Sequence, residues 1–389
     1  MTRPANPAAP ALERSIPQAV ARAAQGRYAL VAPAADVWDA FVQQHPQGHL
    51  LQHAAWGTLK TSAGWQVQRI AVLAPAPTTP PAAQLVAGAQ VLLRVRYGVS
   101  VAYVPRGPLF SGDLEADALL LHALRQLARR HRAIYLRLEP NLLETDPAAN
   151  ALHTWLLLHR YTPTAPIQPR SSVHVDLRPP TATLFASFSK GHRADIRRAE
   201  RQGVQVRVGT ADDLPAFYAI MQATSQRAAF GIHSAAYYRQ AWQLFQPRAG
   251  LLLATLADDP AQVVAAHLVF ADALRGYYLY SGATEAGLKS GANHLLEWHA
   301  LQWAQQQGCS SYDLWGVPDA LGQAAHLPDH PATAAARAAL EAAAQDDPLI
   351  GVYRFKKGFG GQVVRYLPAY DLILLAPLYR AVGRLRRLS

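Results

Sequence analysis

The 389-residue chain has one cysteine, Cys309, and two methionines. A single cysteine excludes disulfides within the chain and zinc sites built on cysteine, so we expect Cys309 to be a small buried residue. No apolar run reaches the roughly 20 residues that a membrane-spanning helix needs. The Ala- and Pro-rich start of the chain lacks the apolar segment of a signal peptide. The sequence predicts a cytoplasmic protein with a flexible tail over residues 1–27.

Several signatures of catalysis and of metal binding are also missing. The 15 histidines form no HExxH motif and no cluster with cysteine, and His294 and His299 are five residues apart, which splits them across a helix. No G-x-S-x-G turn and no Ser/His/Asp set is present. The segment Phe355–Gly361 lacks the spacing and the hydroxyl residue of a P-loop. We therefore expect no metal and no cofactor.

What the chain does have is positive charge. It carries 37 Lys and Arg against 26 Asp and Glu, a net charge of +11 with a pI near 9.9. Such a balance favours an anionic partner: a nucleic acid, a phosphorylated metabolite or an anionic membrane surface. A basic protein without such a partner is the alternative. With 50% hydrophobic residues, the chain is long enough for two hydrophobic cores and hence two domains.

The stretch Tyr277–Gly316 organises the rest of the chain. An aromatic strand ends at Ser281-Gly282, a polar loop follows over residues 283–291, and Asn293 is a suitable N-cap for the next helix. That helix ends at Gly308, and Ser310–Leu314 returns as a buried strand. The pattern predicts an α/β unit with its loop at the edge of a sheet, where ligands tend to bind.

The same order of elements occurs twice along the chain. In the first half we predict strands at 65–73, 85–96 and 101–104, a helix at 114–130 and a buried strand at 133–138. In the second half we predict strands at 251–257, 262–271 and 276–281, a helix at 293–307 and a strand at 310–314. This repetition predicts two mixed α/β domains, each with a fold of the acetyltransferase type, joined by the Pro-rich linker 163–170.

The second half has further helices, predicted at 184–202, 214–228 and 235–245, and an Ala-rich, mobile insertion over 318–348 with a helix near 333–344. Along the first of these helices, four basic residues fall at helical spacing: Lys190, Arg193, Arg197 and Arg201. Such a stripe either follows a phosphate backbone or is a solvated helix face. A final strand is predicted from Val363 to about Leu374.

Other basic residues lie near glycines or helix ends. Lys356 and Lys357 stand beside three glycines, a combination that suits an oxyanion or a phosphate, although a surface hairpin with solvated lysines is the alternative. Lys60 follows Trp56 by one helical turn, and Arg227 lies near a helix end. Asp313 lies in a predicted core strand, where we expect it to support a loop rather than to catalyse.

The chain ends in LYRAVGRLRRLS. Apolar residues interspersed with Arg380, Arg384, Arg386 and Arg387 suit an anionic membrane leaflet. A terminal helix with a solvated basic face is the other interpretation. The segment therefore leaves open whether the protein contacts the inner face of the cell membrane.

A set of short motifs resembles the FemABX family, the aminoacyl-tRNA-dependent transferases that build peptidoglycan cross-bridges. The resemblance extends from Leu50 to Asp371 and rests on the order of these motifs. They are Gln52-x-x-x-Trp56-x-x-x-Lys60, Tyr103-Val-Pro-Arg-Gly-Pro108, Lys190–Gly203, Thr224-x-x-Arg227, Tyr280–Ala283, Asn293–Trp298, Tyr312–Gly316 and Phe355–Gly361.

The resemblance implies two acetyltransferase-like (GNAT-like) domains with mixed sheets, over 28–165 plus 368–389 and over 166–367. It implies transfer of an amino acid from aminoacyl-tRNA to a stem-peptide amine of UDP-MurNAc-pentapeptide or its lipid-linked form. Lys60 and Arg227 match positions that bind the acceptor's phosphates, and Tyr280 matches a substrate-contacting tyrosine. Lys356 matches a lysine that acts on the aminoacyl end and its developing oxyanion. We take Lys190, Arg193, Arg197 and Lys357 as tRNA-binding candidates.

The sequence departs from the family in two places. No sustained heptads appear, so we expect no coiled-coil arm, and residues 109–112 separate the Gly-Pro turn from Asp113, where some members have an acidic residue closer to the turn. One alternative is an acyl-CoA-dependent N-acyltransferase, although the loop from Gly287 to Asn293 lacks the paired G-x-G that would hold a pyrophosphate. A second alternative is a non-catalytic RNA-binding protein.

Overall fold

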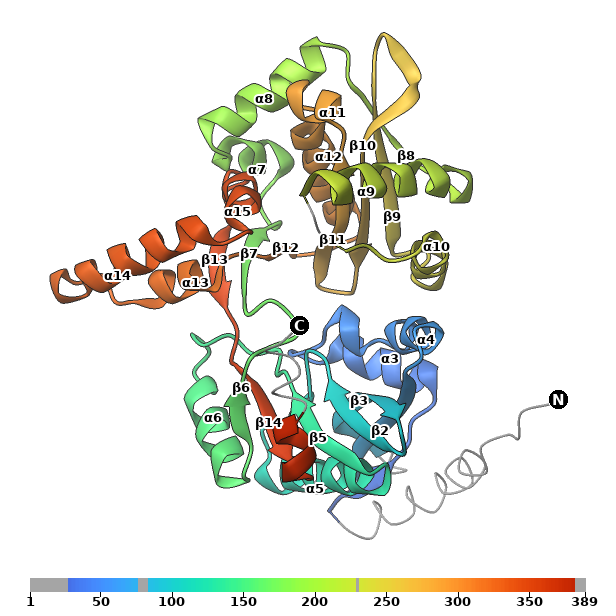
Figure 1. Cartoon of the computed structure of the whole chain (residues 1–389), viewed down its shortest axis with the longest axis vertical. Coiled ribbons are helices and arrows are strands. Elements are labelled where there is room, and N and C mark those ends of the chain that lie inside the picture. The colour runs from blue at the N-terminus through green and yellow to red at the C-terminus, as the bar shows by residue number, and fades with distance from the viewer. Residues whose placement is uncertain (1–26, 76–82, 229–230, 382–389) are drawn as a thin grey trace. The chain divides into compact units, whose positions relative to one another are not determined.

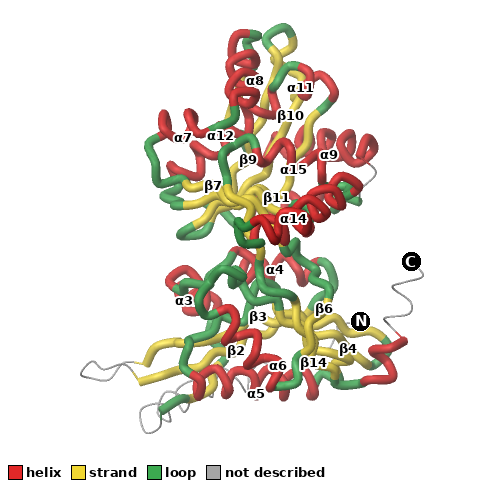
Figure 2. Tube along the Cα trace, turned by 90° about the vertical axis from the view of Figure 1, so that its left-hand side faces the viewer, coloured by secondary structure: helices red, strands yellow, loops and turns green. Residues whose placement is uncertain are grey.

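The computed structural model describes residues 27–75, 83–228 and 231–381. Apart from Arg27, the predicted flexible tail lies outside the described residues, as do Arg384, Arg386 and Arg387. The chain forms two compact units: residues 1–168 with 366–389 make unit 1, and residues 169–365 make unit 2. Each unit has its own mixed sheet flanked by helices (Figures 1 and 2).

Unit 1 is built on a seven-stranded sheet in the order β1-β2-β3-β4-β5-β14-β6. Its elements are β1 (Ala29–Val31), α3 (Ala35–Gln44), a 3-10 turn (Leu50–Gln52), α4 (Ala54–Ser62), β2 (Gln66–Pro75), β3 (Ala83–Arg96), β4 (Val99–Val104), α5 (Leu114–Arg130), β5 (Ala133–Leu138), α6 (Ala149–Leu158), β6 (Thr162–Thr164) and β14 (Ala369–Ile373). Strands β4 and β5 are parallel, and the other neighbours are antiparallel.

Unit 2 also has a seven-stranded sheet, in the order β13-β7-β12-β11-β10-β9-β8. Its elements are β7 (Ser171–Asp176), α7 (Thr181–Ser187), α8 (Lys190–Arg201), β8 (Gln205–Val208), a 3-10 turn (Ala211–Asp213), α9 (Leu214–Ala228), α10 (Ala235–Leu244), β9 (Ala249–Leu256), β10 (Asp259–Ala271), β11 (Arg275–Ala283), α11 (Glu285–Lys289), α12 (Ala292–Gln306), β12 (Ser311–Gly316), α13 (Asp319–His326), α14 (Pro331–Ala343), a 3-10 turn (Ala344–Asp346), α15 (Ile350–Lys357) and β13 (Gln362–Arg365).

The two sheets have the same plan. Read from β1 and from β8, each begins with four antiparallel strands, continues with one parallel pair (β4/β5 and β11/β12) and ends with two antiparallel neighbours. Strand β14, from the end of the chain, enters the sheet of unit 1 between β5 and β6. The predicted duplicated, acetyltransferase-like α/β fold is confirmed.

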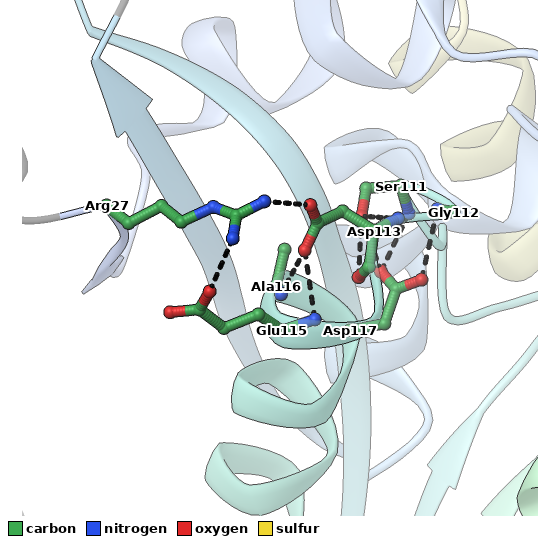
Figure 3. Close-up of polar contacts among 7 residues, drawn as sticks. All are labelled: Arg27, Ser111, Gly112, Asp113, Glu115, Ala116 and Asp117. Atoms are coloured by element: carbon green, nitrogen blue, oxygen red, sulfur yellow. Dashed lines mark hydrogen bonds and ion pairs between the residues drawn. The ribbon is translucent and has the colours of Figure 1, made fainter.

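Local chemistry explains why α5 and β5 match their predicted bounds. The Asp113 side chain caps α5 by accepting hydrogen bonds from the backbone N–H groups of Glu115 and Ala116 (Figure 3). Two arginines in the last turn interact favourably with the negative end of the helix dipole. All six residues of β5 are buried, as expected for a short, mostly apolar strand in the middle of a sheet, and its one charged residue, Arg137, pairs with Asp371.

Other predicted bounds are wrong. The helix predicted at 184–202 is two helices, α7 and α8, because Phe188 and Ser189 are extended and the Ser189 side chain caps α8 by accepting from His192 N–H. Asn293 is not an N-cap: α12 begins one residue earlier, after Gly291, whose positive φ of 80° suits glycine. The predicted loop before it contains the short helix α11.

The end of unit 2 also differs from the prediction. The insertion over 318–348 contains two helices, α13 and α14, rather than one, and Asp319 at the start of α13 pairs with Arg365. The alternative interpretation of the segment around Lys356, a surface hairpin, is wrong, because this segment forms the helix α15. The final predicted strand is divided between β13 in unit 2 and β14 in unit 1. No helix in the described part of unit 2 is longer than 15 residues.

Among the described residues, no helix has both the length and the apolarity to span a lipid bilayer. Cys309 is buried, as predicted.

Candidate functional site

Lys356 lies at the point where strands β11 and β12 separate. The two strands pair in parallel from Arg275 to Tyr277 of β11, and the pairing ends there although both strands continue. Lys356, near the end of α15, points its ammonium at the open end of β12. The Nζ atom donates hydrogen bonds to the carbonyl oxygens of Trp315 (3.1 Å) and Gly316 (2.7 Å). Helix α15 thus places a positive charge at the opening between the two strands.

The environment of Lys356 is unusual for a lysine. The residue is only 4% exposed, and its Nζ atom lies 5.9 Å from the centre of the Tyr278 ring. Burial lowers the pKa of Lys356 to about 8, against the opposing effect of Asp313 and Glu297. An ammonium group has three N–H donors. Two of them bond to the β12 carbonyls, which leaves one to stabilise negative charge on a substrate.

Asp313 fixes the strand end that receives Lys356. Its Oδ1 atom accepts hydrogen bonds from the backbone N–H of Trp315 (2.7 Å) and from the Ser172 hydroxyl. Its burial alone would raise the pKa of the carboxyl group, but His174, Arg275 and Ser172 together hold that pKa well below its usual range. This agrees with the interpretation that Asp313 supports a loop, since Trp315 has a positive φ of 65° that needs such support.

Behind Lys356 lies a buried acid–base pair that sequence reasoning missed. His267 Nδ1 is 3.1 Å from Glu297 Oε2, and both side chains are fully buried. His267 Nε2 is 3.2 Å from Asn293 Oδ1, so the residue predicted as an N-cap instead contacts this pair. Glu297 lies within the Asn293–Trp298 motif, which was the available signal. Glu297 opposes the lowering of the Lys356 pKa that burial causes.

Arg227, near the end of α9, contacts the end of β11. Arg227 Nη1 donates to the carbonyl oxygen of Ala283 (2.7 Å), at the end of β11, while Thr224 Oγ1 accepts from the Ala283 N–H (3.1 Å). The Thr224-x-x-Arg227 motif therefore fastens α9 to this strand end. Arg227 is exposed, so the rest of its guanidinium can reach a ligand.

Tyr280 of β11 packs against two tyrosines of α10, Tyr237 and Tyr238. Its hydroxyl is 3.4 Å from that of Tyr237, and its ring packs edge-on against Tyr238. Tyr278 contacts His267 and Phe355 instead. The pairing of β10 with β11 shifts between Tyr278 and Tyr280, and such a bulge redirects side chains. Tyr278 and Tyr280 therefore contact different helices.

Lys60 lies in unit 1, on the last turn of α4. Its Nζ atom is 4.4 Å from the centre of the Trp56 ring, the residue four positions earlier. Burial lowers the pKa of Lys60 to about 8. Desolvation and an aromatic partner make this lysine different from an ordinary surface lysine.

Helix α8 holds three of the four predicted tRNA-binding residues and contacts α15, which holds the fourth. Lys190 and Arg197 are exposed, and Arg197 lies 5.5 Å above the Phe185 ring. The Arg193 side chain is half-buried. It donates a hydrogen bond to the carbonyl oxygen of Ala186, in the last turn of α7. Lys357 is exposed, one residue after Lys356.

Two hydrogen bonds and a ring contact join α8 to α15. His192 Nε2 lies 2.7 Å from the Phe355 carbonyl, so Nε2 carries the proton, and Ser189 N–H donates to the Gly358 carbonyl (2.8 Å). The His192 ring also packs edge-on against Phe359. Phe355, Gly358 and Phe359 flank Lys356 in sequence. The position of Lys356 therefore depends on the helix that carries the basic stripe.

The carboxylates of Asp113 and Asp117 both accept hydrogen bonds from backbone N–H groups. Figure 3 shows Arg27 paired with Asp113 (2.7 Å) and Glu115, while Asp117 accepts from Ser111 and Gly112 N–H groups. Asp113 thus caps a helix rather than acting as a base. Among the described residues, no group of His, Cys, Asp and Glu is arranged to hold a metal ion.

Comparison with known proteins defines the class first. The chain superposes on a structure described as FemX with a TM-score of 0.75 and 19% identity, covering 91% of this chain and 99% of that one. It also resembles a structure of L-PGS from Bacillus licheniformis, with a TM-score of 0.51 and 14% identity, covering 92% and 97% of the two chains. These likenesses concern the fold: two acetyltransferase-like units in one chain.

The family follows from sequence. The model of the FemAB family matches residues 34–259 and 257–386, and the chain belongs to that family. Among curated relatives, lipid II:glycine glycyltransferase from Staphylococcus saprophyticus is 23% identical over 420 residues, 90% of this chain and 94% of the relative. The protein of the same name from Staphylococcus aureus is 21% identical over 424 residues, with coverages of 90% and 93%.

Proposed function

We propose that this protein transfers an amino acid from aminoacyl-tRNA to an amine on the stem peptide of a peptidoglycan precursor. Family membership and the names of the curated relatives support this class of acyl transfer. The observation that carries the proposal is the buried ammonium of Lys356. It donates hydrogen bonds to two backbone carbonyls of β12, close to where β11 and β12 stop pairing. The acceptor we propose is UDP-MurNAc-pentapeptide or its lipid-linked form.

The reaction asks little of the protein beyond positioning and charge. The acceptor amine attacks the ester carbonyl carbon, a C–N bond forms, and the C–O bond to the 3′ oxygen of the tRNA breaks. The amine loses a proton and the departing 3′ oxygen gains one, so charge and atoms balance. Between these steps the carbonyl oxygen becomes an oxyanion, and the remaining N–H donor of Lys356 is suited to stabilise it.

The other basic residues suit the two polyanionic substrates. In our proposal Lys60 and Arg227 bind the phosphates of the acceptor, and Tyr280 contacts it from the α10 side of β11. Lys190, Arg193, Arg197 and Lys357 bind the tRNA backbone. Because His192 fastens α8 to α15, tRNA bound on α8 also stabilises the helix that presents Lys356.

The proposal is tested by mass spectrometry of muropeptides. Cells that contain the protein and cells that lack it are compared after digestion of their walls. We expect the stem peptides of the first to carry one additional amino-acid residue, which also identifies the amino acid and the stem position. Identical muropeptides in both, under conditions where the protein is present, would refute the proposed acceptor.

The charge of Lys356 gives the reaction a dependence on pH. With a pKa of about 8, Lys356 loses its proton as the pH rises through that value, and the oxyanion loses its donor. Arginine stays protonated throughout this range. We expect the ratio of wild-type kcat to that of Lys356→Arg to fall above pH ~8, while ionisation of the acceptor amine, common to both proteins, cancels in the ratio. A ratio independent of pH would remove the proton of Lys356 from the mechanism.

The basic residues of α8 give the reaction a dependence on salt. Each phosphate contact contributes about 0.7 to the slope of log affinity against log salt for a single strand, and about 0.9 for a duplex. We expect Lys190→Gln and Arg197→Gln each to raise KM for aminoacyl-tRNA and to flatten this slope by about that amount. Arg239→Gln, at an exposed position on α10, is the control. An unchanged slope in both α8 variants would identify α8 as a solvated face.

A further inference from the structure

One end of the unit 1 sheet is surrounded by arginines. Strands β4 and β5 begin at this end, and β3 and β14 finish there, as their pairings show. Seven exposed arginines lie at the end of β3, at the end of α5 and in the turn after it, just before β6, and after β14: Arg94, Arg96, Arg129, Arg130, Arg132, Arg160 and Arg380. We call this set the arginine edge.

Backbone contacts bring these segments together. Ser100, at the start of β4, donates its N–H to the Arg132 carbonyl (3.2 Å) and its hydroxyl to the His131 carbonyl (2.8 Å). On the other side of β5, Leu374 N–H donates to the Ile134 carbonyl (3.0 Å). The hairpin, the turn after α5 and the segment after β14 are therefore neighbours within unit 1.

Among the described residues, no carboxylate neutralises the charge of the arginine edge. The segments 90–100, 127–134, 158–162 and 372–381 contain no Asp and no Glu. In the described part of the chain, none of the seven arginines forms an ion pair with a carboxylate. Arg94 contacts the Trp65 ring instead, at 5.5 Å. A local excess of seven positive charges, in a protein whose net charge is +11, calls for an anionic surface.

The hairpin tip presents apolar side chains between arginines. Tyr97 is 99% exposed, and Val95 is 45% exposed. Tyr97 and Gly98 both have positive φ (52° and 75°), as in the tight hairpin turn that favours Asn-Gly. A bulky aromatic residue is disfavoured at such a φ, and this ring packs against nothing in its own unit. The positive φ of Tyr97 costs free energy that no packing of its ring offsets, which points to a contact with something outside the folded chain.

We propose that the arginine edge docks unit 1 on an anionic lipid bilayer, with Tyr97 and Val95 in the interfacial layer and the arginines on lipid phosphates. Tyrosine is enriched at the level of the headgroups, and basic residues near an anionic leaflet each contribute about 1 kcal/mol. A single-stranded nucleic acid would require a groove with aromatic platforms, whereas here the apolar side chains project from a turn. A duplex backbone offers the arginines phosphates but no apolar layer for Tyr97 and Val95, and binding to tRNA is therefore one outcome of the test. The inference does not depend on the transfer reaction, although a lipid-linked acceptor would lie on the same surface.

The test is binding of the full chain to vesicles, measured by sedimentation without tRNA or acceptor. We expect binding to vesicles of phosphatidylglycerol and phosphatidylcholine, little binding to phosphatidylcholine alone, and weakening with added salt. Arg94→Gln and Arg96→Gln should each lower the affinity about fivefold. Tyr97→Asn should lower it without lowering Tm, since asparagine suits the turn. Arg239→Gln, in unit 2, removes one charge elsewhere and should have no effect.

The outcomes separate this inference from the proposed function. If the protein binds both kinds of vesicle alike, or if the arginine-edge variants bind as the wild type does, the inference is wrong. It is equally wrong if these variants lose affinity for tRNA and keep their affinity for vesicles. Transfer to soluble UDP-MurNAc-pentapeptide is measured in parallel. We expect it to be unchanged in all the arginine-edge variants, so loss of docking and loss of transfer are read independently.

Discussion

Replacing Lys356 by methionine is expected to lower kcat by about a hundredfold or more, with little change in KM for either substrate. Removing one donor to a developing oxyanion typically costs a factor of 10²–10³ in kcat. Methionine fills a similar volume and keeps the contact with Tyr278. Because the folded pKa of about 8 is below the ordinary value of 10.5, the buried ammonium costs stability at neutral pH. Methionine also removes the hydrogen bonds to the Trp315 and Gly316 carbonyls, which opposes this gain, so Tm is measured beside kcat to confirm that the variant is folded.

Lys357→Met is the matched control for this experiment. Lys357 is the next residue on α15 but is exposed, so its replacement should raise KM for aminoacyl-tRNA and leave kcat nearly unchanged. Steady-state kinetics with saturating acceptor separate the two effects. If Lys356→Met keeps the wild-type kcat, or if Lys357→Met loses as much kcat as Lys356→Met does, Lys356 does not act on the transition state.

Replacing Lys60 or Arg227 is expected to raise KM for the acceptor about ten- to a hundredfold. A hydrogen bond to a charged group contributes about 1.5–3 kcal/mol, and a phosphate contact that holds the ground state and the transition state alike alters KM rather than kcat. Lys60→Met keeps the side-chain contact with Trp56. Arg227→Gln retains a donor for the Ala283 carbonyl while removing the charge.

Two controls sharpen this prediction. Lys289→Met removes a lysine that is exposed and paired with Glu285, and it should leave KM unchanged. A stem peptide that lacks the diphosphate should bind weakly to the wild type and no more weakly to Lys60→Met or Arg227→Gln. If both variants lose affinity for this phosphate-free peptide as well, the two residues contact the peptide or support the fold, and our assignment is wrong.

Much of the fold follows from local patterns in the sequence. The bounds of α5 and β5 match their predictions because an aspartate cap, an apolar face and a short, mostly apolar strand are all local signals. The repeated order of elements predicted two sheets of one plan, which is what the pairings give. The return of β14 to the first sheet rested on the family resemblance alone, since no local pattern specifies a pairing between residues 234 positions apart such as Arg137 and Asp371.

The site was less predictable because its features depend on tertiary packing. The sequence shows two adjacent lysines beside glycines, but it does not show which of them is buried. In the folded chain Lys356 is buried and Lys357 is exposed. The pairing of His267 with Glu297 joins a strand to a helix 30 positions later, where no spacing rule applies. The break between α7 and α8 was not predicted because the apolar pattern continues through Phe188, although Ser189 is a residue type that often caps helices.

The most direct measurement of the central claim uses purified protein, UDP-MurNAc-pentapeptide, a mixture of aminoacyl-tRNAs and acetyl-CoA in one reaction, analysed by mass spectrometry. We predict a product heavier than the acceptor by one amino-acid residue, formed by the wild type, abolished by ribonuclease and largely lost with Lys356→Met. An acetylated product that survives ribonuclease would contradict the account and identify the chain as an acyl-CoA-dependent transferase. Retention of tRNA without any product would contradict it in favour of an RNA-binding protein.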